Sequence, residues 1–357
     1  MTHAAARSAK NAAALSPKGK HPMGPRTSIS GFSLVELMIA LVLGLVVIGA
    51  AVSIFLSNQQ TFRTTENLAR LQENARFAFE SMAREVREAG GTPCGTKPVA
   101  NVINGGGGWW SWNAQGPLRG YAGNTPGPQA FGTTPGLRAT NTDAILVLSA
   151  SLFEGVTITT HDPTSAQFKV NKTNHGIQND EIVMACDRQS AAIFQVTNAN
   201  QANATIVHNT GGTSPGNCSK GLGIPTDCTS ANGTAKTFSK GGFIARLNAS
   251  FWYIGNNARG GRSLYRLNFS GAPQAQAQEI AEGVTDMLLE YLQITPGTPP
   301  TLPASYVSAA SVTDWANVVA VRLTLIMATT NNVGVDGQAI PRTFMHVISL
   351  REREFAS

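Results

Sequence analysis

The hydrophobic pattern of the chain opens with a long apolar run in residues 32–56. In "FSLVELMIALVLGLVVIGAAVSIFL" the polar side chains are Ser33, Glu36 and Ser53, and Glu36 carries the only charge. About 20 apolar residues suffice to span a bilayer as a helix, so this run is long enough to do so. A carboxylate at membrane depth costs roughly 2.5–3.5 kcal/mol, which marks Glu36 as a residue with a functional partner.

The pattern changes in residues 57–91 from uniformly apolar to amphipathic. Apolar side chains recur there at steps of three and four residues, which is the period of a helix with one buried face. They are Leu68, Leu71, Ala75, Phe79, Met82 and Val86. No proline interrupts the chain from Phe32 onward, and Gly90 and Gly91, followed by Pro93, end the pattern. We therefore expect one continuous helix whose second half packs against a globular body.

The remaining residues, 92–357, have the short alternating runs of β-strands. Residues 92–142 are rich in Gly, Pro, Asn and Thr and are interpreted as a long, irregular surface insertion. Residues 209–240 are similarly loop-like, and residues 279–294 fit either a strand or a helix. Strands are predicted at 143–150, 155–160, 180–186, 191–197, 241–255, 263–270, 315–329 and 343–354.

These patterns define four segments and one fold class. The segments are a leader (1–31), an apolar helix half (32–56), an amphipathic helix half (57–91) and a β-rich domain (92–357). A long helix followed by strands without alternating helices predicts an α+β fold, in which the helix packs on a mostly antiparallel sheet.

The charge distribution assigns the basic balance of the chain to the leader. The formal net charge is +6, but residues 1–31 hold five Lys and Arg and no acid, which leaves +1 (6 − 5) for the rest. A general nucleic-acid surface is therefore not expected.

No small-residue cleavage site follows Leu56, so the apolar run is not interpreted as an ordinary signal peptide. Positive charge before the span keeps the leader cytoplasmic and places the domain across the membrane.

The four cysteines, Cys94, Cys186, Cys218 and Cys228, all lie in the translocated part. An even count in an oxidising compartment favours disulfides, and four cysteines allow three connectivities. We favour Cys218–Cys228 as a short loop staple and Cys94–Cys186 as a tie from the helix exit to the sheet. No C-x-x-C spacing and no histidine in a ligand pattern accompany them, so neither a metal nor another cofactor is expected.

The junction at Gly31 and Phe32 resembles the type III signal of type IV prepilins. The shared features are a basic leader, a small residue, Phe32, an uninterrupted oily helix, and Glu36 four residues further on. The resemblance implies that a membrane prepilin peptidase cuts after Gly31 and methylates the new amine of Phe32. It also implies that Glu36 neutralises such a terminal amine, of a neighbouring subunit or its own, during docking. The leader is longer than is usual in this class, and Met23 is an alternative start.

Later segments resemble the PilW family of minor pilins. They are "ESMAREVREAGG", "CDRQSAAIFQVT", "EGVTDMLLEYL", "WANVVAVRLTLIM" and "VISLRERE". The resemblance implies a pilin-like fold and residence in the bacterial inner membrane, followed by incorporation into pili that serve adhesion and twitching motility. It implies a tip complex that primes pilus assembly. The implied partners are other minor pilins, the major pilin, the inner-membrane assembly platform and a large tip adhesin.

Three other functions are weighed against this one. The layout is also that of the J-type minor pseudopilin of type II secretion, which the sequence does not separate from a pilus subunit. An adhesive module is the second, with Trp109, Trp110 and Trp112 of "NGGGGWWSWN" docking a carbohydrate or a partner. An enzyme is the least supported: "GTSPG" (212–216) matches G-x-S-x-G by letter but lacks the strand–elbow–helix context. His161, His175, His208 and His346 show no metal spacing.

Overall fold

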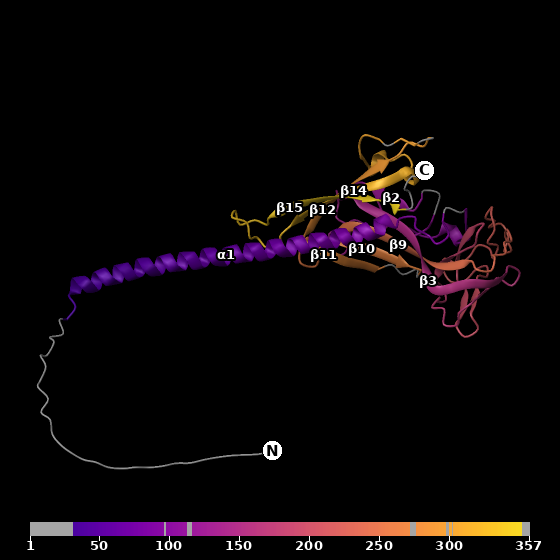
Figure 1. Cartoon of the computed structure of the whole chain (residues 1–357), viewed down its shortest axis with the longest axis horizontal. Helices are drawn as coiled ribbons and strands as arrows, with labels where there is room; N and C mark the ends of the chain where they lie inside the picture. Colours follow the sequence, from indigo (N-terminus) through magenta and orange to yellow (C-terminus); the bar gives the residue numbers. More distant parts are fainter. Residues whose placement is uncertain are drawn as a thin grey trace, which may run out of the picture. The chain divides into compact units, whose positions relative to one another are not determined.

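The computed structural model describes residues 31–95, 98–112, 116–271, 276–297, 300–301 and 303–351 (Figure 1). The chain divides into two units, residues 1–59 and 60–357. The leader prediction, residues 1–31, falls outside the described residues except at Gly31. One helix runs through both units.

Helix α1 spans Leu34–Arg87 without interruption. The predicted helix is confirmed, although it begins two residues later and ends four residues earlier than the pattern suggested. Turns follow Arg87, and Gly90 adopts a φ of 85° while its N–H donates to the Leu148 carbonyl at 2.9 Å. A positive φ is open to glycine without steric cost, so Gly90 ends the helix by joining it to the sheet.

The larger sheet has 11 strands, and β9 and β3 pair at its centre. All its strand pairs are antiparallel except β1 with β6. Its strands are β1 (Val99–Asn101), β2 (Leu118–Tyr121), β3 (Ala144–Asp162), β4 (Gln167–Val170), β5 (Ile182–Cys186), β6 (Ala191–Gln195), β7 (Asn198–Asn200), β8 (Thr205–Val207), β9 (Phe243–Asn256), β10 (Arg262–Ser270) and β11 (Gln276–Glu282).

The smaller sheet has four strands in the order β13-β12-β14-β15. They are β12 (Val284–Gln293), β13 (Val307–Ser308), β14 (Val318–Ala328) and β15 (Pro341–Ser349). Short 3-10 turns also occur at Asn104–Gly106, Ala309–Ser311 and Trp315–Asn317. Together the two sheets confirm the α+β prediction of a long helix and a mostly antiparallel β domain.

Gly283 is the point where the chain passes from the larger sheet to the smaller one. It adopts a φ of 82°, and a Cβ there would lie 2.7 Å from the Ala328 carbonyl oxygen. The segment 279–294, ambiguous in sequence, is therefore the end of β11 followed by β12. β11 pairs with β10, and β12 pairs with β14.

Three buried clusters form the core. The first combines one face of α1 with residues of both sheets, among them Met82, Trp252 and Tyr291. The second contains the disulfide cysteines Cys94 and Cys186, together with Trp110. The third surrounds Phe168 and Phe194 of β4 and β6. These clusters place the buried stripe of the helix against the sheets, as its period predicted.

The interpretation of residues 92–142 as an irregular surface insertion was wrong in part. The segment contributes β1 and β2 to the larger sheet, and Leu118 in β2 is fully buried. Its glycines and prolines separate these short strands, which is why no strand run is visible in the sequence. The predicted strands at 143–150 and 155–160 are one 19-residue strand, β3, with a register shift against β9 between Leu152 and Thr157.

Candidate functional site

The start of α1 is a reciprocal hydrogen-bonded cap formed by Ser33 and Glu36. The Ser33 N–H donates to Glu36 Oε2 at 3.0 Å, and the Glu36 N–H donates to Ser33 Oγ at 3.4 Å. The first turns of a helix leave backbone N–H groups without partners, and a Ser-x-x-Glu box satisfies two of them. Glu36 therefore already has a local partner in the single chain. Our sequence reasoning missed this role, although the Ser-x-x-Glu spacing is typical of a capping box.

The residues before this cap are open to approach. Gly31 has no neighbouring atom within 4 Å of the position a Cβ would take, and the Phe32 side chain is 89% exposed. The Gly31–Phe32 peptide bond thus precedes the first helical residue, Leu34, and is unobstructed in the described chain. A peptide bond that lies outside the helix and is open to solvent is accessible to a protease.

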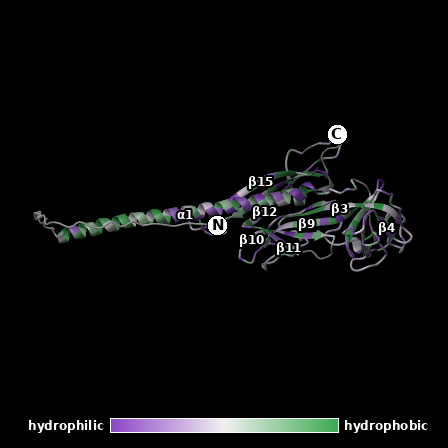
Figure 2. Ribbon diagram, turned by 60° about the horizontal axis from the view of Figure 1, so that its bottom comes forward, coloured by the Kyte–Doolittle hydropathy of each residue, from purple (hydrophilic) through white to green (hydrophobic). Residues whose placement is uncertain are grey.

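The first half of α1 presents apolar side chains on all sides. An 18-residue window of this helix has a mean hydropathy of 2.9 and none of it is buried in the described chain. Figure 2 shows this half predominantly green, with polar residues becoming frequent toward the second half. By length and composition the helix is able to cross a membrane. Such a surface is stable only in lipid or against other apolar helices.

The second half of α1 is held by the β domain through polar as well as apolar contacts. Glu85 accepts hydrogen bonds from Trp252 Nε1 at 2.6 Å and from Arg266 Nη1 at 2.7 Å. Asn74 Nδ2 donates to the Glu282 carbonyl at 3.3 Å. Sequence analysis missed Glu85, because its partners lie 167 and 181 residues away and no local pattern relates them.

The tryptophan-rich segment packs inward. Trp110 is only 7% exposed and stacks on Phe269 with ring centroids 4.6 Å apart. Trp109 meets the same ring edge-on at 6.5 Å, and Trp112 is partly buried against the same cluster. This packing fixes the segment to its own domain. Trp110 is not available as an exposed binding anchor.

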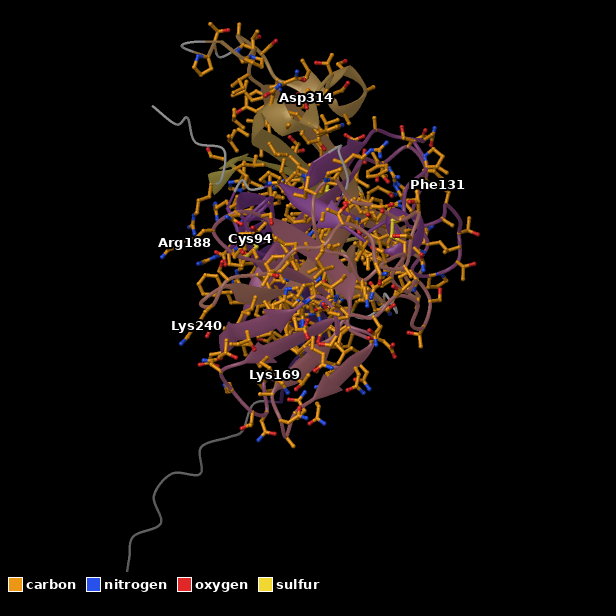
Figure 3. The ribbon with its side chains drawn as sticks, turned by 90° about the vertical axis from the view of Figure 1, so that its right-hand side faces the viewer. Cys94, Phe131, Lys169, Arg188, Lys240 and Asp314 are labelled. Atoms are coloured by element: carbon orange, nitrogen blue, oxygen red, sulfur yellow. A yellow bond between two sulfur atoms is a disulfide. The ribbon has the colours of Figure 1, made fainter. Side chains whose placement is uncertain are left out.

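The cysteines form two disulfides, Cys94–Cys186 and Cys218–Cys228. This is the pairing that sequence analysis favours, with Cα atoms 5.6 Å and 5.2 Å apart. A cavity of about 730 Å³ lies beside the first disulfide and is lined in part by Arg188 and Lys240, both labelled in Figure 3. Asp187, in the same lining, pairs with Lys236 at 3.1 Å.

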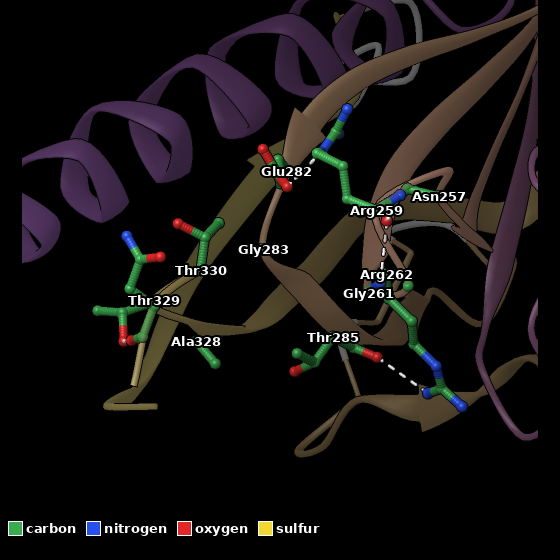
Figure 4. Close-up of a pocket in the computed structure, with 12 residues that line it drawn as sticks. Asn257, Arg259, Gly261, Arg262, Glu282, Gly283, Thr285, Ala328, Thr329 and Thr330 are labelled. Carbon is green, nitrogen blue, oxygen red and sulfur yellow. Dashed lines mark hydrogen bonds and ion pairs between the residues drawn. The ribbon is translucent and has the colours of Figure 1, made fainter. Parts of the chain in front are cut away.

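A second cavity, of about 530 Å³, lies where β11 meets β12 (Figure 4). The Arg259 guanidinium there binds the carboxylates of Glu279 and Glu282. Arg262 Nη1 donates to the Thr285 carbonyl at 3.0 Å. Arg259 is therefore paired with carboxylates, whereas Arg262 bonds to a neutral backbone carbonyl. Its lining residues contain no Ser, Cys or Lys paired with a general base.

Two of the four histidines that show no metal spacing in the sequence lie together in the structure. His161 and His208 are buried with their Nε2 atoms 2.9 Å apart, and the Phe238 N–H donates to His161 Nδ1 at 3.1 Å. Across the described part of the chain, no group of three or more His, Cys, Asp or Glu is placed to hold a metal ion. The pair packs against Phe168 and Phe194 of the third buried cluster.

Two family models match the chain. The model described as Type IV Pilus-assembly protein W matches residues 251–345, and the model described as Prokaryotic N-terminal methylation motif matches residues 26–52. The comparisons with curated proteins and with solved structures find no significant match. The second match contains Gly31, Phe32 and Glu36, and the first contains Trp252 and Arg266, which bind Glu85.

Proposed function

We propose that this chain, which belongs to the PilW family of type IV pilus minor pilins, is cut after Gly31, N-methylated at Phe32 and incorporated into a tip complex that primes pilus assembly. The observation that carries the proposal is the open Gly31–Phe32 junction directly before an apolar helix whose only early charge is Glu36. Before incorporation the chain spans the inner membrane once, with its leader in the cytoplasm. Its partners are the prepilin peptidase, the assembly platform, other pilins and a large tip adhesin.

Cleavage after Gly31 would create a cationic amine on Phe32, at the positive end of the helix dipole. Glu36 lies one helical turn further on and now accepts from the Ser33 N–H. A carboxylate and an amine that leave water together cost less than either charge alone. Where the amine is that of a neighbouring subunit, this pairing favours one register of the two docked helices; where it is the chain's own amine, it lowers the cost of burying both charges.

Two substitutions at Glu36 distinguish the effect of its charge from the effect of its capping hydrogen bonds. Glu36→Gln keeps a residue type that completes a capping box but removes the charge, whereas Glu36→Ala removes both. We expect both variants to be processed, and both to be depleted from sheared pili by about tenfold or more, the effect of about 1.4 kcal/mol in docking. Immunoblots of the pilus and membrane fractions measure this, with a neutral Ser53→Ala variant as control.

The outcomes distinguish the parts of the proposal. Mass spectrometry of the mature N-terminus should give methylated Phe32, and any other first residue refutes the processing step. If E36Q enters pili as well as the wild-type chain does, the charge has no docking role; if E36A is then still depleted, the cap is what matters. If the wild-type chain is absent from sheared pili, the assignment of this protein to the pilus is wrong.

A further inference from the structure

A third cavity, of about 620 Å³, lies where strand β1, the tryptophan-rich segment and the loop closed by the Cys218–Cys228 disulfide come together. Ligand pockets in proteins commonly have volumes of about 300–1,000 Å³. Of the three tryptophans in the segment, Trp112 is the one among the described lining residues. The cavity therefore has room for a small ligand and presents one aromatic side chain to it.

The indole of Trp112 is held in place by the protein. Trp112 is partly buried and packs against the second core cluster, which also contains Trp110. The backbone of the segment lies directly on Trp110, because a Cβ at Gly107 or at Gly108 would come within 2.9 Å of its ring. A fixed aromatic side chain loses little conformational entropy when a ligand stacks on it. The inward packing of Trp110 thus supports a binding role for Trp112.

The polar side chains of the cavity are ordered before any ligand binds. Asn101 Oδ1 accepts from the Ile103 N–H at 3.1 Å, and Asn101 Nδ2 donates to the Gly106 carbonyl at 3.2 Å. The Asn101 N–H donates to Thr226 Oγ1 at 3.3 Å. A threonine hydroxyl that accepts one hydrogen bond still has its own hydrogen to donate. Thr226 is therefore positioned to bond to a ligand.

The short disulfide loop fixes Thr226 to strand β1. Thr226 lies inside the loop that Cys218 and Cys228 close, ten positions apart in sequence. The Cys218 N–H donates to the Val102 carbonyl at 2.7 Å, next to Asn101 in the chain. Thr226 and Trp112 are more than 100 residues apart in sequence, so tertiary contacts and this disulfide bring them to one cavity.

The glycines at 105–108 supply backbone donors to the same cavity. Gly105 and Gly106 have φ values of 64° and 73°, a region that favours glycine, and a Cβ at either would meet no atom within 4 Å. Within the described chain, the N–H groups of Gly105 and Gly108 make no hydrogen bond. These two groups border the cavity and are free to donate to a ligand.

The chemistry of the lining selects the class of ligand. None of the described lining residues is charged, so a phosphate or a carboxylate would find no counter-ion among them. A wholly apolar ligand would leave the amide and hydroxyl groups without partners. A neutral sugar has an apolar C–H face that stacks on an indole and hydroxyl edges that bond to amides and hydroxyls. It matches both parts of the lining.

We propose that this cavity binds a neutral mono- or disaccharide, with one sugar ring stacked on Trp112 and its hydroxyls bonded to Thr226 and to the N–H groups of Gly105 and Gly108. The inference goes beyond the proposed function and does not rest on it. All described lining residues precede residue 251, so the cavity lies outside the part of the chain that matches the PilW model.

The test titrates the full chain, solubilised in a detergent without a sugar headgroup, with four neutral disaccharides: di-N-acetylchitobiose, cellobiose, maltose and lactose. Saturation-transfer NMR detects the bound sugar, and its concentration dependence gives the Kd. We expect at least one of the four to bind saturably. Sialyllactose, which adds a carboxylate to lactose, should bind no more tightly than lactose does.

Two matched pairs of variants locate the site. For the sugar that binds, Trp112→Ala should raise the Kd by about tenfold or more, whereas Trp112→Phe, which keeps an aromatic ring, should raise it less. Thr226→Val should raise the Kd by about threefold or more, and Thr226→Ser should leave it nearly unchanged. The Thr226 pair keeps the tryptophan, so the test does not depend on W112A folding.

Four results overturn the inference. They are no saturable binding of any of the four sugars, an equal Kd for W112A and W112F, an equal Kd for T226V and T226S, or tighter binding of sialyllactose than of lactose. The proposed function is unaffected by all four, because processing at Gly31 and entry into sheared pili are measured separately. Loss of those two properties in the wild-type chain would refute the proposed function and leave the sugar site standing.

Discussion

The buried His161–His208 pair predicts that the β domain loses stability in mild acid. Burial lowers the pKa of His161 to about 4, and burial, followed by the charge of His161, lowers the pKa of His208 to about 3. The charge of Asp162 raises the pKa of His161, and the charge of Lys236 lowers it. The charge of Lys220 lowers the pKa of His208. In an unfolded chain both histidines would titrate near 6.5. The folded chain therefore binds fewer protons than the unfolded chain between about pH 6.5 and 4.

The sign and size of the effect follow from proton linkage. Where the unfolded state binds more protons, the free energy of unfolding falls as the pH falls. At pH 5 each histidine is protonated in the unfolded chain and neutral in the folded one, which costs about 1.4 kcal/mol per pH unit below 6.5. The pair thus removes about 4 kcal/mol between pH 7.5 and 5. This is a large share of a typical domain stability of about 5–15 kcal/mol.

The assay is urea unfolding of the detergent-solubilised chain at pH 7.5 and pH 5. The comparison is with the double variant His161→Gln, His208→Gln, whose side chains remain polar but do not titrate. His175, whose pKa burial also lowers, is present in both proteins and contributes equally. We expect the unmodified chain to lose about 4 kcal/mol more than the variant between the two pH values. An identical loss in the two proteins would refute the reasoning.

Two further predictions concern stability at neutral pH. Glu85→Ala leaves Trp252 Nε1 without an acceptor, so it should lower the free energy of unfolding by about 2–4 kcal/mol. The control, Glu88→Ala at an exposed position, should change it by less than about 0.5 kcal/mol. Equal losses for the two variants in urea melts would contradict this. Replacing the Cys94–Cys186 disulfide by serines should cost about 4.6 kcal/mol and replacing Cys218–Cys228 about 2.8 kcal/mol, because the first closes the longer loop. The reverse order in the same melts would show that strain or packing outweighs loop closure.

The features that sequence analysis predicted are those that depend on residues close together in the sequence. The helix, its change from apolar to amphipathic and most strands depend on neighbours three, four or two residues away. The ambiguity at 279–294 arose because Gly283 splits an apolar run between two sheets, which only the tertiary pairing reveals. Glu85 and the histidine pair depend on contacts between distant segments, so no spacing could have indicated them. The Ser33–Glu36 cap is different: it is local, and the sequence contained it.

The matched region 251–345 also contains the partners of the side-chain hydrogen bonds that join α1 to the β domain. Five side-chain hydrogen bonds join α1 to residues of that region, at Trp252, Arg266, Glu282, Asn331 and Val333. Both disulfides and the histidine pair lie before residue 251, outside the match. If the shared role of the family is to hold an assembling helix, Glu85→Ala should reduce pilus incorporation. Comparing pilus incorporation of the Glu85→Ala variant with that of the histidine double variant therefore tests whether the assembly function depends on the contacts to α1.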